Sequence, residues 1–197
     1  PDAGPAKVAA RAILADLEAR GIANAHLAGH SMGGAIAALS ALMQPQRVAT
    51  LTLLAPGGFG EEINGPLLRR FAAARTHEDI RACLDAMSGP GFVPPDRAAD
   101  ALVQIRSAPG QTEKLVEIGN AITKDDRQGA IPRELLAGLP MPIAIAWGTG
   151  DTVLPYRQTA DLPGNFTLHS ISGAGHMLPE EVPGKVIDLI RRTTGIA

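Results

Sequence analysis

The sequence predicts an α/β fold in which a mostly parallel sheet carries a helical insertion. Three observations favour this class. Short apolar runs recur along the chain, amphipathic helical patterns separate them, and a long middle segment is charged and helical instead. Strands that alternate with helices are typical of parallel α/β sheets. The 197 residues are 45% hydrophobic, which is enough for a packed core.

The first part of the chain predicts a helix, a strand, a second helix and a second strand. Apolar residues recur at steps of three and four over 6–20, which predicts an amphipathic helix that Gly21 ends. Residues 25–29 are short and apolar, and helix-forming residues fill 35–43 after a sharp turn. The run 47–55 is continuously apolar, as expected of a strand covered on both faces.

The remaining elements divide into an insertion and a return to the sheet. Gly-Pro and Pro-Pro turns break up the helical patterns of the middle segment, at 67–75, 77–87 and 96–105. Two further apolar strands, at 142–147 and 166–171, and an amphipathic helix at 183–192 follow. We therefore expect three segments: a core with the first strands over 1–59, a helical cap over 60–138, and the rest of the core over 139–197.

The first motif that carries chemistry is Gly29-His30-Ser31-Met32-Gly33, which fits the pattern G-x-S-x-G. It lies where an apolar strand ends and a helix begins, so the turn strains the backbone and lifts the serine hydroxyl above the sheet edge. The glycines are expected to leave room for neighbouring chain, and the Met32 N–H to stabilise an oxyanion. Alternatively, Ser31 is a helix N-cap, which would explain the serine but neither glycine.

A serine nucleophile needs an imidazole to accept its proton and a carboxylate to orient that imidazole. Asp151 ends a Gly-rich loop that follows the predicted strand 142–147, and His176 lies in a small-residue loop after the strand 166–171. Both loops are expected at the edge of the sheet where ligands bind in open α/β folds. The alternatives are a turn aspartate that bonds its own backbone and a solvated loop histidine.

Three short sequences resemble the α/β-hydrolase superfamily: GHSMGG at 29–34, WGTGD at 147–151 and GAGH at 173–176. The resemblance covers nearly the whole chain, and it implies an α/β-hydrolase fold with the triad Ser31, Asp151 and His176 in the family's chain order. A serine at the turn disfavours the branches that attack with a carboxylate. Residues 58–65 are similar to the start of the cap in the hydrolase-like C-terminal domain of acetoin dehydrogenase E2 acyltransferases, or are simply an acidic loop before a capped helix.

The resemblance also implies that parts of the fold lie elsewhere. The family places several strands, and the loop with the second oxyanion N–H, ahead of the serine turn, whereas 30 residues precede Ser31 here. We therefore expect the N-terminal strands and the second donor to be missing from this chain, which would be the C-terminal portion of a longer protein. The E2 resemblance would place a lipoyl domain upstream.

Composition limits the ligands and partners. The net charge of −2 offers no basic field for nucleic acid, and no apolar stretch is long enough to span a membrane. The single cysteine, Cys83, fits a reducing compartment, so we expect a cytoplasmic protein with a buried thiol. No metal and no cofactor is expected. Side chains expected to contact a small acyl substrate are His30, Met32, Phe59, Phe71 and Met177.

Three functions remain open at this level. The first is a serine hydrolase that cleaves an ester, thioester or related acyl substrate through an acyl-enzyme on Ser31. The second is an acyltransferase like the acetoin dehydrogenase E2 dihydrolipoamide acetyltransferase component, which would use the same triad. The third is a non-catalytic partner-binding module in which the triad is silent.

Overall fold

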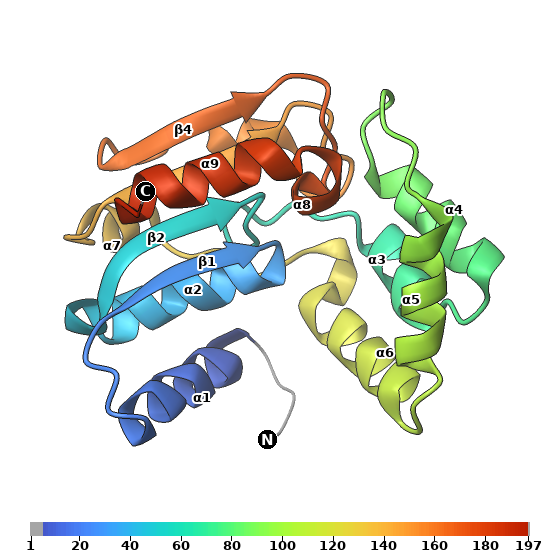
Figure 1. Ribbon diagram of the computed structural model, residues 1–197, viewed down its shortest axis with the longest axis horizontal. Helices are drawn as coiled ribbons and strands as arrows, with labels where there is room; N and C mark the ends of the chain where they lie inside the picture. The colour runs from blue at the N-terminus through green and yellow to red at the C-terminus, as the bar shows by residue number, and fades with distance from the viewer. Residues whose placement is uncertain (1–5, 197) are drawn as a thin grey trace.

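The computed structural model describes residues 6–196, and these form one parallel sheet with helices around it (Figure 1). The sheet has four strands in the order β1-β2-β3-β4, and every neighbouring pair is parallel. The strands are β1 Ala25–His30, β2 Val48–Leu54, β3 Ile143–Gly148 and β4 Phe166–Ile171. The expected fold class is confirmed, and each expected strand lies within one residue of its predicted bounds at either end.

Helices α1 Ala6–Ala19, α2 Met32–Met43 and α9 Pro183–Thr194 cover the sheet. In Figure 1, α2 runs along β1 and β2 with α1 packed outside it, while α9 runs along the strands and packs against β2 and β3. The helix expected to begin at residue 35 begins at Met32, so the serine turn passes into it without a linker. Within residues 6–196, no helix is both long and apolar enough to cross a membrane.

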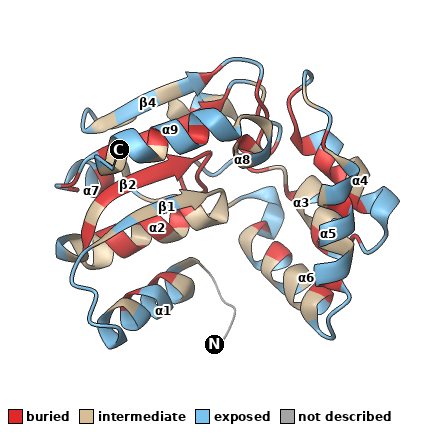
Figure 2. Ribbon diagram, in the orientation of Figure 1, coloured by how far each residue is buried: buried red, intermediate tan, exposed pale blue. Residues whose placement is uncertain are grey.

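Burial explains why the central strands read as continuous apolar runs. All of β3 is buried, and β2 is buried except at one residue, because helices cover both of their faces (Figure 2). The outer strands β1 and β4 are half-exposed. The largest buried side chain is Trp147 on β3, whose indole Nε1–H donates a hydrogen bond to the Leu154 carbonyl at 2.9 Å.

Four helices form the cap that stands beside the sheet in Figure 1. They are α3 Gly65–Ala73, α4 His77–Met87, α5 Asp96–Arg106 and α6 Gln111–Ile122. The side chain of Asn64 caps α3, and that of Thr76 caps α4. The buried Arg106 guanidinium donates hydrogen bonds to the last carbonyls of α3 and lies over the Phe71 ring, which joins α5 to α3. The cap therefore has a small core of its own.

The division of the chain at residues 59 and 138 stays a prediction. Near the second of these boundaries lies α7 Arg133–Ala137, whose Leu136 belongs to the main core. The charged, short pattern of α7 resembles that of the cap helices, so only its packing separates it from them. The remaining short helices are Pro45–Arg47, Lys124–Asp126, Tyr156–Thr159 and α8 Leu178–Glu181.

The segments that lead into and out of the cap lie side by side. The Gln128 N–H donates to the Glu61 carbonyl at 2.9 Å, and the Ile131 N–H donates to the Gly58 carbonyl at 2.8 Å. An isolated antiparallel bridge between Glu62 and Arg127 extends this pairing. The junction between cap and core is thus a paired ribbon, and the first of its two segments follows β2 in the chain.

Candidate active site

Ser31 lies in a strained turn between β1 and α2. Its φ of 54° and ψ of −121° fall in a region that residues with a Cβ rarely adopt. The strain is held in place because the Ser31 N–H donates to the Leu54 carbonyl and the Gly57 N–H donates to the Ser31 carbonyl, both at 2.9 Å. The Ser31 side chain makes no capping hydrogen bond to α2, so the N-cap interpretation does not hold.

Close backbone packing at this turn depends on Gly29 and Gly34. A Cβ on Gly29 would lie 2.2 Å from the Gly33 carbonyl oxygen, and one on Gly34 would lie 2.5 Å from Pro56. The expectation that Gly33 itself leaves room is not met, because among the described residues a Cβ there would meet nothing within 4 Å. Gly33 takes part in the close packing through its carbonyl oxygen, which lies where a Cβ on Gly29 would be.

Replacing Gly29 with alanine is therefore expected to destabilise the protein by about 3 kcal/mol, because the obstructing atoms are backbone and cannot move aside. Gly33→Ala is the matched control, and it should leave the free energy of unfolding unchanged or slightly raised, since alanine favours a helix. Urea unfolding of both variants measures the difference. Equal stabilities of the two variants would contradict this account of the turn.

His176 connects Ser31 to Asp151. The Ser31 Oγ lies 2.9 Å from His176 Nε2, and His176 Nδ1 lies 2.9 Å from Asp151 Oδ2. A carboxylate only accepts, so Nδ1–H donates to Asp151 and the neutral ring is left with Nε2 to accept from the Ser31 hydroxyl. The His176 and Asp151 side chains are 3% and 0% exposed, so water does not compete for this pair. The structure thus brings the three predicted residues together from three separate loops.

The two carboxylate oxygens of Asp151 have different partners. Oδ1 accepts hydrogen bonds from the Val153 and Leu154 N–H groups, each at 2.8 Å, as in an aspartate turn. Oδ2 holds His176. Because the Trp147 indole also fixes the Leu154 carbonyl, the carboxylate is locked in one orientation.

His30 supports the backbone at His176. Burial, and then repulsion from His176, lower the pKa of His30 to about 4, so its ring is neutral near neutral pH. Its Nε2–H donates to the His176 carbonyl at 2.7 Å, and the two ring centroids are 4.8 Å apart. The ring was expected to contact substrate, but its Nε2–H is occupied by this bond and the residue does not line the cavity described below.

The lowered pKa makes stability depend on pH between about 4 and 6.5. In this window the unfolded histidine binds a proton that the folded one does not, so the free energy of unfolding should rise with pH. Between pH 7 and pH 4.5, the free energy of unfolding of the parent should fall by on the order of 2 kcal/mol more than that of His30→Gln. The glutamine amide can donate to the same carbonyl but does not titrate. Urea unfolding across this range tests it; parallel pH curves for the two proteins would count against a neutral, buried His30.

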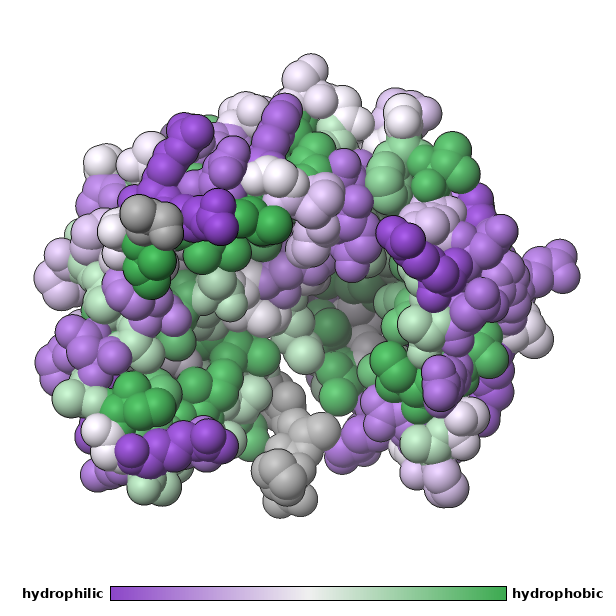
Figure 3. Space-filling view, in the orientation of Figure 1, coloured by the Kyte–Doolittle hydropathy of each residue, from purple (hydrophilic) through white to green (hydrophobic). Residues whose placement is uncertain are grey.

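A cavity of about 360 Å³ opens beside Ser31, between the core and the cap, and Figure 3 shows this face hollowed between the two with hydrophobic residues on its walls. Its walls come from the start of α1, from α2, α3 and α6, from the ribbon at the cap junction, and from Leu154 of the loop that carries Asp151. The polar side chains at its surface are those of Ser31, Lys7 and Gln128, and the rest of the lining is apolar or glycine. Met32 also lines the cavity, and its N–H makes no hydrogen bond within residues 6–196.

Of the side chains expected to contact substrate, Met32 lines this cavity and the others do not. Phe59 is 2% exposed and packs edge-on against Trp147 and Phe166 in the main core. Phe71 and Met177 lie between the main core and the cap core. Phe59 follows a buried strand, and its position inside the core depends on tertiary contacts that its local sequence does not reveal.

The chain matches the model of the Alpha/beta hydrolase family over residues 1–189. It belongs to this family. The match covers nearly the whole chain, as the three short motifs implied. Within the described residues, no group of three or more His, Cys, Asp or Glu side chains is arranged to hold a metal ion.

Two curated relatives and one solved structure are similar to this α/β hydrolase. It is 35% identical to the dihydrolipoyllysine-residue acetyltransferase component of an acetoin cleaving system from Pseudomonas putida, over 88% of this chain and 46% of the relative. It is 45% identical to a 2-hydroxy-6-oxo-6-phenylhexa-2,4-dienoate hydrolase from Burkholderia cepacia, over 86% of this chain and 62% of the relative. The meta-cleavage product hydrolase CumD from Pseudomonas fluorescens IP01 superposes with a TM-score of 0.84 at 21% identity, covering 98% and 73% of the two chains.

These likenesses confirm the resemblance to acetoin-system acetyltransferase components and the fold. The α/β hydrolase spans about half the length of the acetyltransferase relative. That this chain lacks the N-terminal strands and the second oxyanion donor, and that a lipoyl domain lies upstream, stay predictions.

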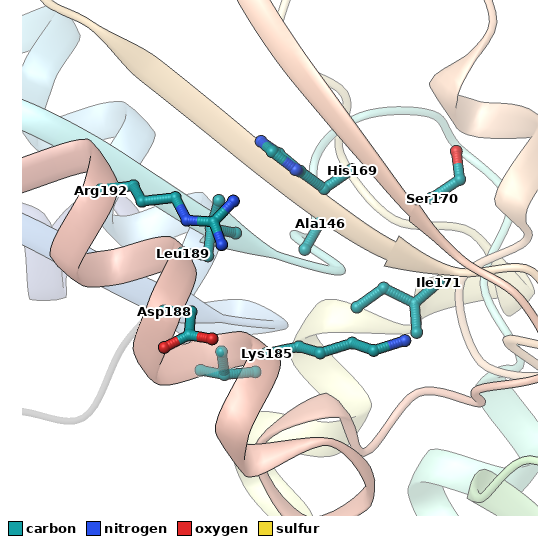
Figure 4. Close-up of a pocket in the computed structure, with 9 residues that line it drawn as sticks. Ala146, His169, Ser170, Ile171, Lys185, Asp188, Leu189 and Arg192 are labelled. Carbon is teal, nitrogen blue, oxygen red and sulfur yellow. The ribbon is translucent and has the colours of Figure 1, made fainter.

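A second hollow, of about 220 Å³, lies between β4 and α9, away from Ser31 (Figure 4). The side chains of Lys185, Asp188 and Arg192 project from α9 beside His169 of β4. Both signs of charge are present and α9 is solvent-exposed on this side, so the hollow resembles an ordinary charged surface. Cys83 lies elsewhere, fully buried in α4, where burial raises the pKa of its thiol.

Two residues near the site were not singled out from the sequence. Gln128 accepts a hydrogen bond from the Gly58 N–H at 3.1 Å and lines the cavity, so it joins the cap junction to the loop beside Ser31. Glu181 accepts hydrogen bonds from backbone groups on both sides of His176. A glutamine in a charged segment and a glutamate in a short helix are usually solvated, so the local sequence did not indicate a role for either residue.

Proposed function

We propose that this α/β hydrolase cleaves an ester, thioester or related acyl substrate through an acyl-enzyme on Ser31. The observation that carries the proposal is the chain of two 2.9 Å hydrogen bonds from Ser31 through His176 to Asp151, at the floor of an apolar cavity. A solvated histidine or an isolated turn aspartate would not produce this alignment. The strained serine and the unpaired Met32 N–H beside it support the same function.

The acylation step follows from the tautomer of His176. The Ser31 oxygen attacks the acyl carbon while its proton passes to His176 Nε2, and Asp151 stabilises the imidazolium that forms. The negative charge on the acyl oxygen is held by the Met32 N–H. As the bond from the acyl carbon to the leaving group breaks, His176 gives its proton to that group.

Deacylation repeats these steps with water. Water loses a proton to His176 Nε2 and attacks the acyl carbon, and the Ser31 oxygen leaves and takes the proton back. The cavity favours an acyl group that is small and mostly apolar, because its volume is near the lower end of the roughly 300–1,000 Å³ typical of ligand sites. Lys7 and Gln128 offer hydrogen-bond donors to a polar group on the substrate.

The test is hydrolysis of matched esters and thioesters across acyl chain lengths by the intact protein, with mass spectrometry of the trapped enzyme. We expect an acyl adduct on the peptide that contains Ser31, and faster turnover of short than of long acyl chains. The panel includes a 6-oxo-dienoate, since one relative is named for such a substrate. No turnover of any member, together with no labelling of Ser31 by a fluorophosphonate, would leave the partner-binding module as the better account.

Acyl transfer is the second candidate, and the similarity to acetoin-system acetyltransferase components favours it. In that reaction a thiol replaces water in the deacylation step, so the three residues keep their roles. Adding dihydrolipoamide to the ester assay separates the two functions. Formation of an acyl thioester at the expense of free acid supports transfer, and an unchanged yield of free acid supports hydrolysis.

A further inference from the structure

The Glu181 carboxylate accepts three backbone hydrogen bonds from two different parts of the chain. Oε2 accepts from the Gly175 N–H at 2.8 Å and from the Gly89 N–H at 2.9 Å, and Oε1 accepts from the Met177 N–H at 2.9 Å. Gly175 and Met177 are the two neighbours of His176. Gly89 belongs to the cap, just after α4. A single half-buried side chain therefore holds the histidine loop on both sides and ties it to the cap.

The end of α4 touches the histidine loop through the backbone as well. The His176 N–H donates to the Met87 carbonyl at 2.8 Å. Gly89 and Gly175 meet so closely that a Cβ on Gly175 would lie 2.4 Å from the Gly89 nitrogen. The acid loop is also attached, since the Thr152 hydroxyl donates to the Ala86 carbonyl at 2.7 Å. The cap is thus fastened to the loops of Asp151 and His176, and not only to the ribbon at its junction.

Charge makes Glu181 suited to this position. A carboxylate has acceptor sites only, and hydrogen bonds to an ionised acceptor are about twice as strong as neutral ones. Glutamine has the same shape, but when its carbonyl faces Gly89 and Gly175 its NH₂ group faces the Met177 N–H, donor against donor. The chemistry of the site therefore selects the charged residue.

We propose that Glu181 is a positioning residue that sets the His176 imidazole between Ser31 and Asp151 and makes the cap and the histidine loop move as one unit. This inference rests on the proposed function. Glu181 does not line the cavity beside Ser31, so it acts through His176 and not on the substrate. A substrate that shifts the cap would shift His176 with it.

The expected effect of Glu181→Gln is a loss of about 10- to 100-fold in kcat with little change in KM, since small misplacement of a reacting group costs this much. Glu134→Gln is the matched control. Glu134 is an exposed glutamate on α7, and its side chain makes no hydrogen bond or ion pair within the described part of the chain. The control should keep the activity of the parent.

Leaving-group dependence distinguishes positioning from general destabilisation. We compare kcat/KM for an aryl ester and an alkyl ester of the same acyl group, because the alkoxide needs the proton of His176 to leave and the aryl oxide does not. Glu181→Gln should lower kcat/KM for the alkyl ester about 10-fold more than for the aryl ester. A variant that is only less stable loses both activities equally, and that result would overturn the proposal.

Amide hydrogen exchange gives a readout that needs no activity. In Glu181→Gln, exchange at Gly89, Gly175 and Met177 should accelerate by about 10-fold or more, while Glu134→Gln should match the parent. Unchanged exchange at these amides would overturn the proposal. If the parent hydrolyses neither ester and Ser31 does not label, the proposed function fails, and the exchange rates alone then decide whether Glu181 holds the loop to the cap.

Discussion

Replacing Ser31 with alanine is expected to lower kcat for acyl hydrolysis by about 10⁴- to 10⁶-fold, because the Ser31 hydroxyl is the one that bonds His176 Nε2 within the described part of the chain. The strained backbone of the turn is held by hydrogen bonds to Leu54 and Gly57 that do not involve the side chain, so alanine should fold normally. Ester hydrolysis and fluorophosphonate labelling measure the loss, and circular dichroism and the Tm measure the fold.

Ser172→Ala provides the control for Ser31. Ser172 is an exposed serine in the loop that carries His176, and its hydroxyl makes no hydrogen bond within residues 6–196. The Ser172 variant should hydrolyse and label like the parent. Activity that survives Ser31→Ala at more than about a hundredth of the parent rate would assign the nucleophile elsewhere.

Asp151→Asn is expected to lower kcat by about 10⁴-fold while leaving the loop intact. The asparagine carbonyl can still accept from the Val153 and Leu154 N–H groups, which directs its NH₂ group at His176 Nδ1. Nδ1 must then accept, so the ring proton moves to Nε2, which can no longer take a proton from Ser31. The steady-state rate of ester hydrolysis measures the loss.

Asp188→Asn controls for a change of one charge. Asp188 is exposed on α9 beside the second hollow, away from Ser31 (Figure 4). This variant should retain the parent rate, and both variants should retain the parent Tm within a few degrees. An Asp151→Asn protein that loses stability but keeps its rate per folded molecule would show that the aspartate serves the turn alone.

The parts of the fold that follow from local pattern could be predicted from the sequence. Strands β2 and β3 are covered on both faces, so nearly every residue must be apolar and the runs stand out. Ser31 could be found because a strand that turns directly into a helix needs a glycine where the backbone packs closely. Asp151 and His176 could be found because parallel strands place the loops at their carboxyl ends along one edge.

Other features depend on contacts between residues far apart in the chain. His30 bonds the carbonyl of His176, 146 positions away, and Glu181 reaches Gly89, 92 positions away. α7 has the local pattern of a cap helix but packs in the core, and Phe59 follows a strand as a pocket residue could but is buried. No local pattern distinguishes these positions, because each is set by what the folded chain places against it.

The sequence by itself determined the class of the fold and the family, and it singled out Ser31, Asp151 and His176 as candidate catalytic residues. Only the tertiary structure decided that Ser31, His176 and Asp151 lie within hydrogen-bond distance, which side chains surround the cavity, and how the cap is attached to the histidine loop. The physical reason is that the burial of a strand or helix face and the strain of a turn depend on residues close in sequence, so they produce a local sequence pattern. Hydrogen bonds such as those of Glu181 join groups that only folding brings together.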